Sequence, residues 1–270
     1  MADKKSKKQK KQKKKKKNRN KKLLVSTAAF ITAAVVVVFC LYYVYYEKPY
    51  FDLISVNIDG NLTYSDEYIM EKSGIEIGKK IFDIDRLKVK EALEKEVYVE
   101  KIRVVYELPN KIFLDIKERA DKYQIHFNNE YIIIDKDGIV LRCDIEKLEL
   151  ITIESYTNVV YNIGDTIQFD GIKSSEKIFN AIEYLTNEYG SDTINSFNIG
   201  GNNSFLFETE YGTAVKIDLS EDINYQIVFA MKIINERLNN NLTVATGLID
   251  FTKGDSPVYM EDFKMEEYNE

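Results

Sequence analysis

Few residues of this sequence have the types and spacing that catalysis requires. Nucleophilic catalysis by Ser or Cys needs a positioned base, and the one His, His126, lies at an expected domain junction, where packing or surface exposure is its usual role. The chain has neither a G-x-S-x-G motif nor a G-x-x-x-x-G-K-S/T phosphate loop. Cys40 and Cys143 are too few for a disulfide framework. We therefore predict a binding protein with no catalytic residues, cofactor or metal.

The acidic residues allow two further kinds of chemistry. Asp135-x-Asp137-Gly138 resembles the start of a calcium loop, but position six would be Val140 where the loop needs Gly, and position twelve would be Glu146. The apolar segments on both sides favour a β-hairpin with an Asp-Gly turn. Paired carboxylates could also hydrolyse glycans, although no pair stands out among so many acids.

Charge divides the chain into two unequal parts. Residues 1–22 contain fourteen Lys or Arg and one Asp, whereas the remaining residues contain 24 basic and 43 acidic ones. The acidic part would repel phosphate, which excludes a uniformly basic nucleic-acid-binding protein. The apolar share of 44% is typical of a globular protein.

An uncharged run of 24 residues, Leu23 to Tyr46, predicts a membrane-spanning helix. At ~1.5 Å per residue it would reach roughly 36 Å, enough to cross a ~30 Å hydrocarbon core. A cleaved signal peptide would have a shorter apolar run, and a lipoprotein signal at Cys40 would not have bulky Phe39 before it. We therefore expect an uncleaved single-pass anchor.

The Lys-rich tail, residues 1–22, predicts the orientation of this anchor. Basic flanking segments stay in the cytoplasm, so we expect a cytoplasmic N-terminus in the plasma membrane and extracytoplasmic domains after residue 46. The tail has no aromatic residue for base stacking. We therefore expect it to be attracted to anionic membrane lipid and not to bind nucleic acid.

Residues 47–120 predict a small domain with the element order β-α-α-β-β, in which two helices cover one face of a sheet. Apolar and polar residues alternate over residues 54–59, 101–106 and 112–117, which indicates strands. A first helix would be capped by Thr63 or Ser65 and would end at Gly74. A second helix would bury residues in the helical spacing Val89, Ala92, Leu93 and Val97.

Residues 121–260 predict a strand-rich α+β domain, and residues 261–270 a flexible acidic tail. Helices are indicated over residues 174–189 and 222–239 by their apolar spacing. Gly200-Gly201-Asn202-Asn203 predicts a turn. Besides the hairpin around Gly138, we expect strands over residues 193–199, 204–209, 214–219, 243–251 and 257–259.

The order of these features resembles the FtsQ/DivIB family of bacterial cell-division proteins. The small domain resembles the POTRA domain of that family at Ile58-Asp59-Gly60-Asn61, Gly74, Gly78, Ile81, Asp85, Leu108-Pro109-Asn110 and Ile116-x-Glu118-Arg119. The family often has Pro after the Glu-Arg pair, where this chain has Ala120. Ile134-Asp135-x-x-Gly138 resembles the family's entry into its second domain, and Ile249-Asp250-Phe251 resembles its final strand.

The resemblance implies a non-enzymatic membrane scaffold of the division complex. Such a scaffold binds FtsL-type and FtsB/DivIC-type proteins at the septum and helps to control septal peptidoglycan synthesis. The resemblance also implies that a partner adds a strand to a sheet edge near the C-terminus. Pro257 suits an edge because it cannot donate a ladder hydrogen bond. The implied partner-binding residues are Thr252, Lys253, Gly254, Ser256, Pro257, Val258 and Tyr259, with the last two as apolar anchors.

Several alternatives stay open at the level of sequence. The chain could be an anchored POTRA-type adaptor of another envelope or sporulation complex, or a wall hydrolase that uses carboxylates. The C-terminal strand could close the sheet without binding a partner. A second docking edge is expected in the small domain, around Ile112–Ile116.

Overall fold

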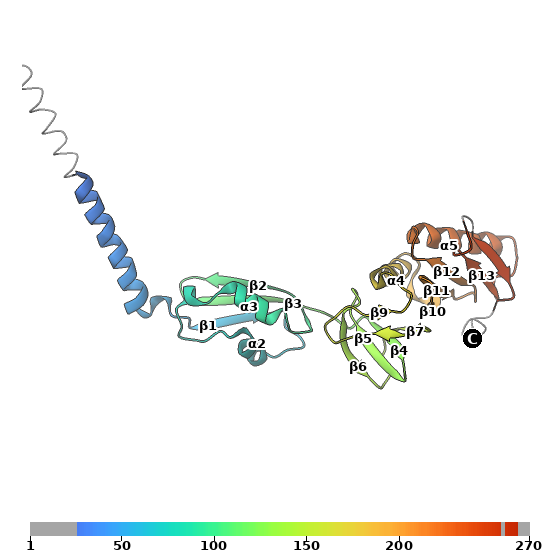
Figure 1. The fold of residues 1–270 in the computed structure, drawn as a ribbon, viewed down its shortest axis with the longest axis horizontal. Helices are drawn as coiled ribbons and strands as arrows, with labels where there is room; N and C mark the ends of the chain where they lie inside the picture. Colours follow the sequence, from blue (N-terminus) through green and yellow to red (C-terminus); the bar gives the residue numbers. More distant parts are fainter. Residues whose placement is uncertain (1–25, 255–256, 264–270) are drawn as a thin grey trace, which may run out of the picture. The chain divides into compact units, whose positions relative to one another are not determined.

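The computed structural model describes residues 26–254 and 257–263, with the backbone but not the side chain of Val258. The predicted basic tail, residues 23–25 of the predicted span and most of the predicted acidic tail lie outside the described residues. Within them, one helix, Ser26–Glu47, is long and apolar enough to cross a membrane. Figure 1 shows this helix ahead of the two folded parts of the chain.

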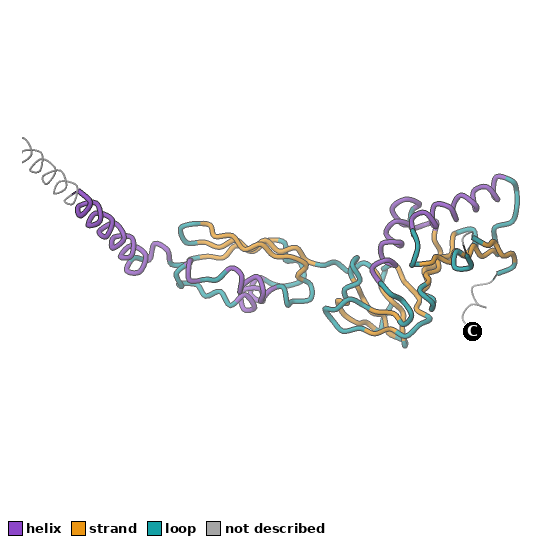
Figure 2. Tube along the Cα trace, turned by 45° about the horizontal axis from the view of Figure 1, so that its top comes forward, coloured by secondary structure: helices purple, strands orange, loops and turns teal. Residues whose placement is uncertain are grey.

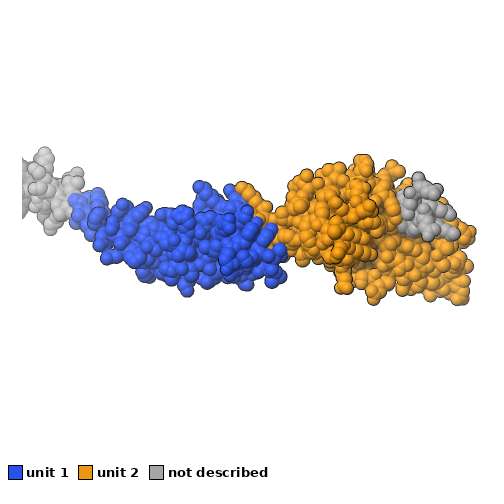
Figure 3. Space-filling view, turned by 90° about the horizontal axis from the view of Figure 1, so that it is seen from below, with its two compact units in different colours: residues 1–92, 102–116 blue, residues 93–101, 117–270 orange. Residues whose placement is uncertain are grey.

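The chain divides into two compact units, which Figure 3 shows in different colours. The first holds the residues up to 92 and residues 102–116, and the second holds residues 93–101 and the residues from 117 onward. Both combine helices with β-structure. This composition confirms the predicted α+β class with an N-terminal apolar helix.

A three-stranded sheet with the strand order β1-β3-β2 organises the first unit. Ile69 of α2, Val89 of α3, and Ile112 and Leu114 of β3 are all buried. The long elements follow the predicted order β-α-α-β-β. The elements are η1 (Pro49–Phe51), β1 (Ser55–Asp59), α2 (Asp66–Ser73), η2 (Ile81–Asp83), α3 (Arg86–Leu93), β2 (Val99–Glu107) and β3 (Lys111–Glu118).

The ends of the two helices follow from local hydrogen bonds. The Ser65 hydroxyl accepts a hydrogen bond from the Tyr68 amide at 3.2 Å, and Gly74 ends α2 with a left-handed φ of 64°. Helix α3 ends at Leu93, so the prediction that Val97 lies on its buried face is wrong. The chain turns there because the Glu96 amide bonds to the Leu93 carbonyl at 3.1 Å.

The predicted docking edge around Ile112–Ile116 is also wrong. These residues lie in β3, which is the central strand between β1 and β2. Strand β1 pairs with β3 in parallel, with Val56 opposite Ile112 and Ile58 opposite Leu114. The error arises because alternation identifies a strand but not its neighbours. The backbone groups of β3 are used on both sides, so β3 cannot accept a further strand.

A nine-stranded sheet with the order β14-β13-β12-β11-β10-β7-β4-β5-β6 organises the second unit, beside a two-stranded sheet β8-β9. The strands are β4 (Tyr123–Phe127), β5 (Glu130–Ile134), β6 (Val140–Asp144), β7 (Ile151–Ser155), β8 (Val159–Val160), β9 (Gln168–Phe169), β10 (Ile194–Ile199), β11 (Ser204–Thr209), β12 (Ala214–Asp218), β13 (Gly247–Asp250) and β14 (Val258–Glu261). The helices are α4 (Ser175–Tyr189), η3 (Ser191–Thr193) and α5 (Ile223–Asn239).

The predicted antiparallel hairpin is present as β5-β6, and the predicted strands β10, β11 and β12 form an antiparallel meander. The last predicted strand is shorter than expected, because β13 covers only four residues. Three parallel pairings, β4-β7, β7-β10 and β12-β13, were not predicted. They join strands that are separated by long stretches of chain.

One face of the large sheet forms a core with both helices. On the neighbouring strands β10, β11, β12 and β13, four residues lie opposite one another in register and belong to one buried cluster: Phe197, Phe207, Val215 and Ile249. Helices α4 and α5 contribute apolar residues to the same cluster, and Figure 2 shows both helices beside these strands. The buried apolar residues of the helices are Ile178, Phe179, Ala181, Ile182 and Leu185 of α4 and Ile227, Ala230, Met231 and Ile234 of α5.

Candidate functional site

The C-terminal strand β14 is an edge of the nine-stranded sheet. It pairs antiparallel with β13, with Tyr259 opposite Ile249 and Val258 opposite Asp250. Within the described residues, no strand pairs with its other side. Backbone N–H and C=O groups on such a side can bond to a strand of another chain. Strand β14 therefore has the position that strand addition requires.

The opposite edge of the sheet, β6, is partly covered by its own chain. The Val140 amide donates to the Asp165 carbonyl at 2.9 Å, and the Val140 carbonyl accepts from the Gly164 amide at 2.8 Å. Ile139 forms an isolated bridge with Thr166. This loop occupies the beginning of β6. Strand β14 is therefore the more open edge in the described part of the sheet.

The half-buried ring of Tyr259 packs against its own unit. The Arg237 guanidinium lies 3.8 Å from the ring centroid, and the Tyr259 hydroxyl donates to the Thr243 carbonyl at 3.4 Å. A side chain at Gly247 would clash with the Tyr259 hydroxyl, so Gly247 makes room for the ring. Sequence reasoning missed this role because the contacting residues lie far from Tyr259 in the chain. The ring holds β14 on the sheet, whatever else it contacts.

Asp250 shapes the beginning of the predicted docking segment. Its buried carboxylate accepts hydrogen bonds from the Thr252 amide at 2.8 Å and the Thr252 hydroxyl at 2.7 Å. The Lys253 ammonium lies 3.8 Å from the other carboxylate oxygen. The acidic residue of the Ile249-Asp250-Phe251 motif thus orders the first residues of the loop between β13 and β14.

The other predicted site residues lie along the same loop and strand. Gly254 has a φ of 124°, a backbone conformation that favours glycine. Pro257 is half-buried and directly precedes β14. Ser256 and the side chain of Val258 lie outside the described residues. Among the described ones, Tyr259, Thr252 and Lys253 have side-chain contacts with other residues of the unit.

A cavity of about 440 Å³ lies beside this loop. Two of its carboxylates stabilise local turns, since Asp218 accepts from the Ser220 amide at 2.7 Å and Asp222 accepts from the Tyr225 amide at 3.0 Å. Sequence reasoning did not identify this cavity, and only the position of Asp222 before a helical pattern pointed to the region. Its lining residues are Asp218, Glu221, Asp222, Tyr225, Gln226, Phe251, Thr252 and Gly254.

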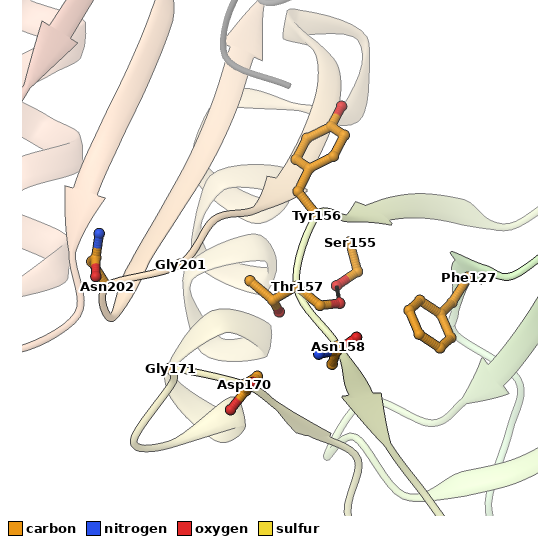
Figure 4. Close-up of a pocket in the computed structure, with 9 residues that line it drawn as sticks. All are labelled: Phe127, Ser155, Tyr156, Thr157, Asn158, Asp170, Gly171, Gly201 and Asn202. Carbon is orange, nitrogen blue, oxygen red and sulfur yellow. Dashed lines mark hydrogen bonds between the residues drawn. The ribbon is translucent and has the colours of Figure 1, made fainter. Parts of the chain in front are cut away.

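A second, open cavity of about 550 Å³ lies in the same unit and is drawn in Figure 4. It is lined by Phe127, Ser155, Tyr156, Thr157, Asn158, Asp170, Gly171, Gly201 and Asn202. Among these described residues Asp170 is the one carboxylate, so the lining has no carboxylate pair for acid–base chemistry on a glycan. Asn202 has a left-handed φ of 59° between β10 and β11. This confirms the turn that was predicted there.

The remaining candidate residues have structural contacts. His126 lies in β4, where its Nδ1 is 2.9 Å from Glu154 Oε2 on the neighbouring strand β7 and its ring stacks on Tyr131 at 5.0 Å. Cys143 is an exposed free thiol in β6. No group of three His, Cys, Asp or Glu residues that could hold a metal ion occurs in the described part of the chain.

The contacts of Asp135 favour a hairpin turn over a calcium loop. Its Oδ1 accepts hydrogen bonds from the Asp137 and Ile139 amides at 2.9 and 2.8 Å. Its Oδ2 lies 2.6 Å from Nη1 of Arg119. Both carboxylate oxygens are thus engaged within the protein. The pair also joins two motifs that the sequence analysis named separately, the one ending in Arg119 and the one from Ile134 to Gly138.

Comparison with known proteins places these features in context. The family model "POTRA domain, FtsQ-type" matches residues 51–119. The chain is 28% identical over 214 residues to the cell division protein DivIB of Clostridium botulinum strain Hall, which covers 78% of this chain and 82% of the relative. It is 32% identical over 124 residues to the DivIB protein of Clostridium acetobutylicum. This match covers 45% of this chain and 50% of the relative.

Proposed function

The chain belongs to the FtsQ/DivIB family of cell-division proteins, and from this premise we propose that it is a non-enzymatic, single-pass scaffold of the bacterial division complex. It binds FtsL-type and FtsB/DivIC-type proteins at the septum and thereby helps to control septal peptidoglycan synthesis. The position of β14 at the open edge of the large sheet carries this proposal. The shared name of the relatives and the POTRA match support its division role.

The proposal includes an orientation in the membrane. The Lys-rich tail stays in the cytoplasm, and the POTRA domain (residues 47–120) and the β-rich domain (residues 121–260) are extracytoplasmic. Each basic residue near an anionic membrane surface contributes about 1 kcal/mol of attraction. The tail thus holds anionic lipid and does not bind nucleic acid.

Docking takes place on the outer side of β14. A strand of the partner bonds to the free backbone groups of β14, while Thr252, Lys253, Gly254 and the residues from Ser256 to Tyr259 contact its side chains. Lys253 suits this role because its side chain is about half exposed and its ammonium makes only long contacts, 3.8 Å from Asp250 and 3.5 Å from Met260 Sδ.

Co-purification of the full-length protein with FtsL-type and DivIC-type chains from detergent-solubilised membranes tests the docking edge. We expect Val258→Asp to reduce partner capture about tenfold, a loss of about 1.4 kcal/mol, because a carboxylate placed in the docking strand must be desolvated. Cys143→Asp, in the opposite edge strand β6, is the matched control and should leave capture unchanged. Equal capture by both variants, with wild-type melting temperatures, would assign docking to another surface.

Tyr259 needs a separate pair of variants because its ring also packs within the unit. Tyr259→Ala removes the contact with Arg237 and should lower both the melting temperature and partner capture. Tyr259→Phe keeps the ring and loses only the hydrogen bond to Thr243, so we expect wild-type capture. Capture of a different protein in place of the FtsL-type and DivIC-type chains would instead support an adaptor of another envelope complex.

A further inference from the structure

Four aromatic rings connect the end of the apolar helix to the POTRA domain. The ring of Tyr45, in the last turn of the helix, lies 5.7 Å from that of Phe51 and 5.9 Å from that of Phe82. The rings of Phe51 and Phe82 are 5.7 Å apart, and those of Phe82 and Tyr106 are 6.0 Å apart. We call Tyr45, Phe51, Phe82 and Tyr106 the aromatic collar. It is continuous with the helix that is long enough to cross a membrane.

Polar contacts hold the end of the helix against the domain. The Tyr45 hydroxyl donates to the Asp83 carboxylate at 3.1 Å. The Lys80 ammonium lies 2.5 Å from the Asp52 carboxylate and donates to the Lys48 carbonyl at 3.0 Å. These bonds join η1, η2 and the helix, so the collar is one packed cluster and not a set of separate side chains on a free linker.

The collar also has an exposed apolar side. Phe82 is 49% exposed, and Tyr50, Ile54 and Leu108 are more than half exposed. The Ile54 amide donates to the Asn110 carbonyl at 2.9 Å, which places the turn between β2 and β3 at the same end of the domain as Ile54. Large apolar side chains thus gather at the end of the sheet that follows the helix.

The length of the helix indicates where this surface lies relative to the membrane. A helix needs about 20 residues to cross the hydrocarbon core, and the 22 residues from Ser26 to Glu47 therefore bring Tyr45 to the membrane–water interface. Phe82, within 5.9 Å of Tyr45 between ring centroids, lies at a similar depth. Aromatic rings favour this interface, and the exposed Lys48 side chain can extend toward the headgroups.

We propose that the exposed side of the aromatic collar, with Tyr50, Ile54 and Leu108, is a lipid-binding surface that seats the POTRA domain on the membrane interface. The occupant is the headgroup and upper acyl region of the phospholipid layer. This inference rests on the helix crossing the membrane, as the proposed function also requires. The surface restricts how far the POTRA domain can tilt away from the bilayer, which a flexible linker would not do.

The absence of Trp from the sequence allows a direct test. Phe82→Trp in the full-length protein introduces a single tryptophan, which is measured in vesicles of phosphatidylethanolamine and phosphatidylglycerol with brominated acyl chains. We expect blue-shifted emission and several-fold stronger quenching by bromine near the headgroup end of the chain than by bromine at the chain terminus. Tyr50→Trp, at a second exposed position, should behave in the same way even if Phe82→Trp perturbs the collar.

Leu62→Trp is the matched control, because Leu62 is 93% exposed and follows the other end of β1. It should show water-exposed emission and little quenching. Val36→Trp, near the middle of the apolar helix, should be quenched by bromine at the chain terminus. Quenching at positions 82 and 50 no stronger than at position 62 would overturn the lipid-binding surface and leave the collar to a protein partner. Loss of quenching at position 36 would overturn both the surface and the anchor.

Discussion

Gly138 shows how a single residue supports the hairpin between β5 and β6. Its φ of 79° lies in the left-handed region, and a Cβ at this position would clash with the ring of Phe179. The turn therefore needs glycine for its backbone conformation and for the close approach of α4. The Asp-Gly pair predicted the turn from local chemistry, but the contact with Phe179 depends on how α4 packs.

Tyr123 carries a polar group that its surroundings do not satisfy. Its ring is fully buried and stacks on Phe179 at 5.8 Å, and its hydroxyl has no hydrogen-bond partner among the described residues. Burial, and secondarily the charge of Glu183, raises the pKa of Tyr123 from 10.0 to about 12. Burial of an unpaired hydroxyl costs free energy that a phenyl ring would not cost.

We therefore expect Tyr123→Phe to keep or raise the free energy of unfolding, by up to about 1 kcal/mol. Tyr156→Phe, which removes a hydroxyl that donates to Asn198 at 3.1 Å, should lower the free energy of unfolding.

The raised pKa of Tyr123 also makes the free energy of unfolding depend on pH. Between pH ~10, where the unfolded tyrosine loses its proton, and about 12, where the buried one does, the free energy of unfolding falls as the pH rises; below pH ~10 Tyr123 adds no pH dependence. Urea unfolding of the detergent-solubilised protein at pH 7 and pH 10.5 would measure both effects, and a loss of stability in Tyr123→Phe at pH 7 would contradict this account.

At the level of elements, the Arg119–Asp135 ion pair joins the segment after β3 to the turn after β5. The Asp135 side chain is only 4% exposed, and its Oδ2 is 2.6 Å from Nη1 of Arg119. Removal of one partner from a buried pair leaves an uncompensated charge. The pair thus fixes the segment that leads into β4 against the turn between β5 and β6.

We expect Arg119→Ala to lower the free energy of unfolding by about 3 kcal/mol. Lys117→Ala is the matched control, since the Lys117–Glu100 pair has a similar distance of 2.7 Å but an exposed lysine, and its loss should cost less than about 1 kcal/mol. Chemical denaturation of both variants gives the comparison. Similar losses would mean that Asp135 is satisfied by its two backbone amides alone.

For the whole molecule, the proposed orientation places Cys143 outside the cell and Cys40 within the membrane-spanning helix. Both thiols are free, and Cys143 is exposed on β6. In intact cells stripped of their wall, we expect a membrane-impermeant maleimide to label the protein, and Cys143→Ser to abolish the labelling. Labelling that appears only after lysis would reverse the orientation.

The residues that predicted the fold did so through local physics. An uncharged run predicted the apolar helix. Apolar residues repeating every two residues predicted strands β10 to β12, and those repeating every 3.6 residues predicted helices α4 and α5, because each repeat places apolar side chains on one buried side of the element. Ser65, Gly74 and the Asp-Gly pair marked ends and turns through hydrogen bonds within a few residues. The family resemblance rested on the same motifs.

Strand neighbours and distant contacts could not be obtained in this way. The central position of β3, the parallel pairs β4-β7 and β7-β10, and the covered edge of β6 depend on which strands meet after long crossovers. Any strand offers the same backbone donors and acceptors, so local pattern does not identify its neighbour. The packing of Tyr259 on Arg237 likewise joins β14 to α5. The open side of β14 is thus a property of the folded sheet, although its residues are legible as a strand in the sequence.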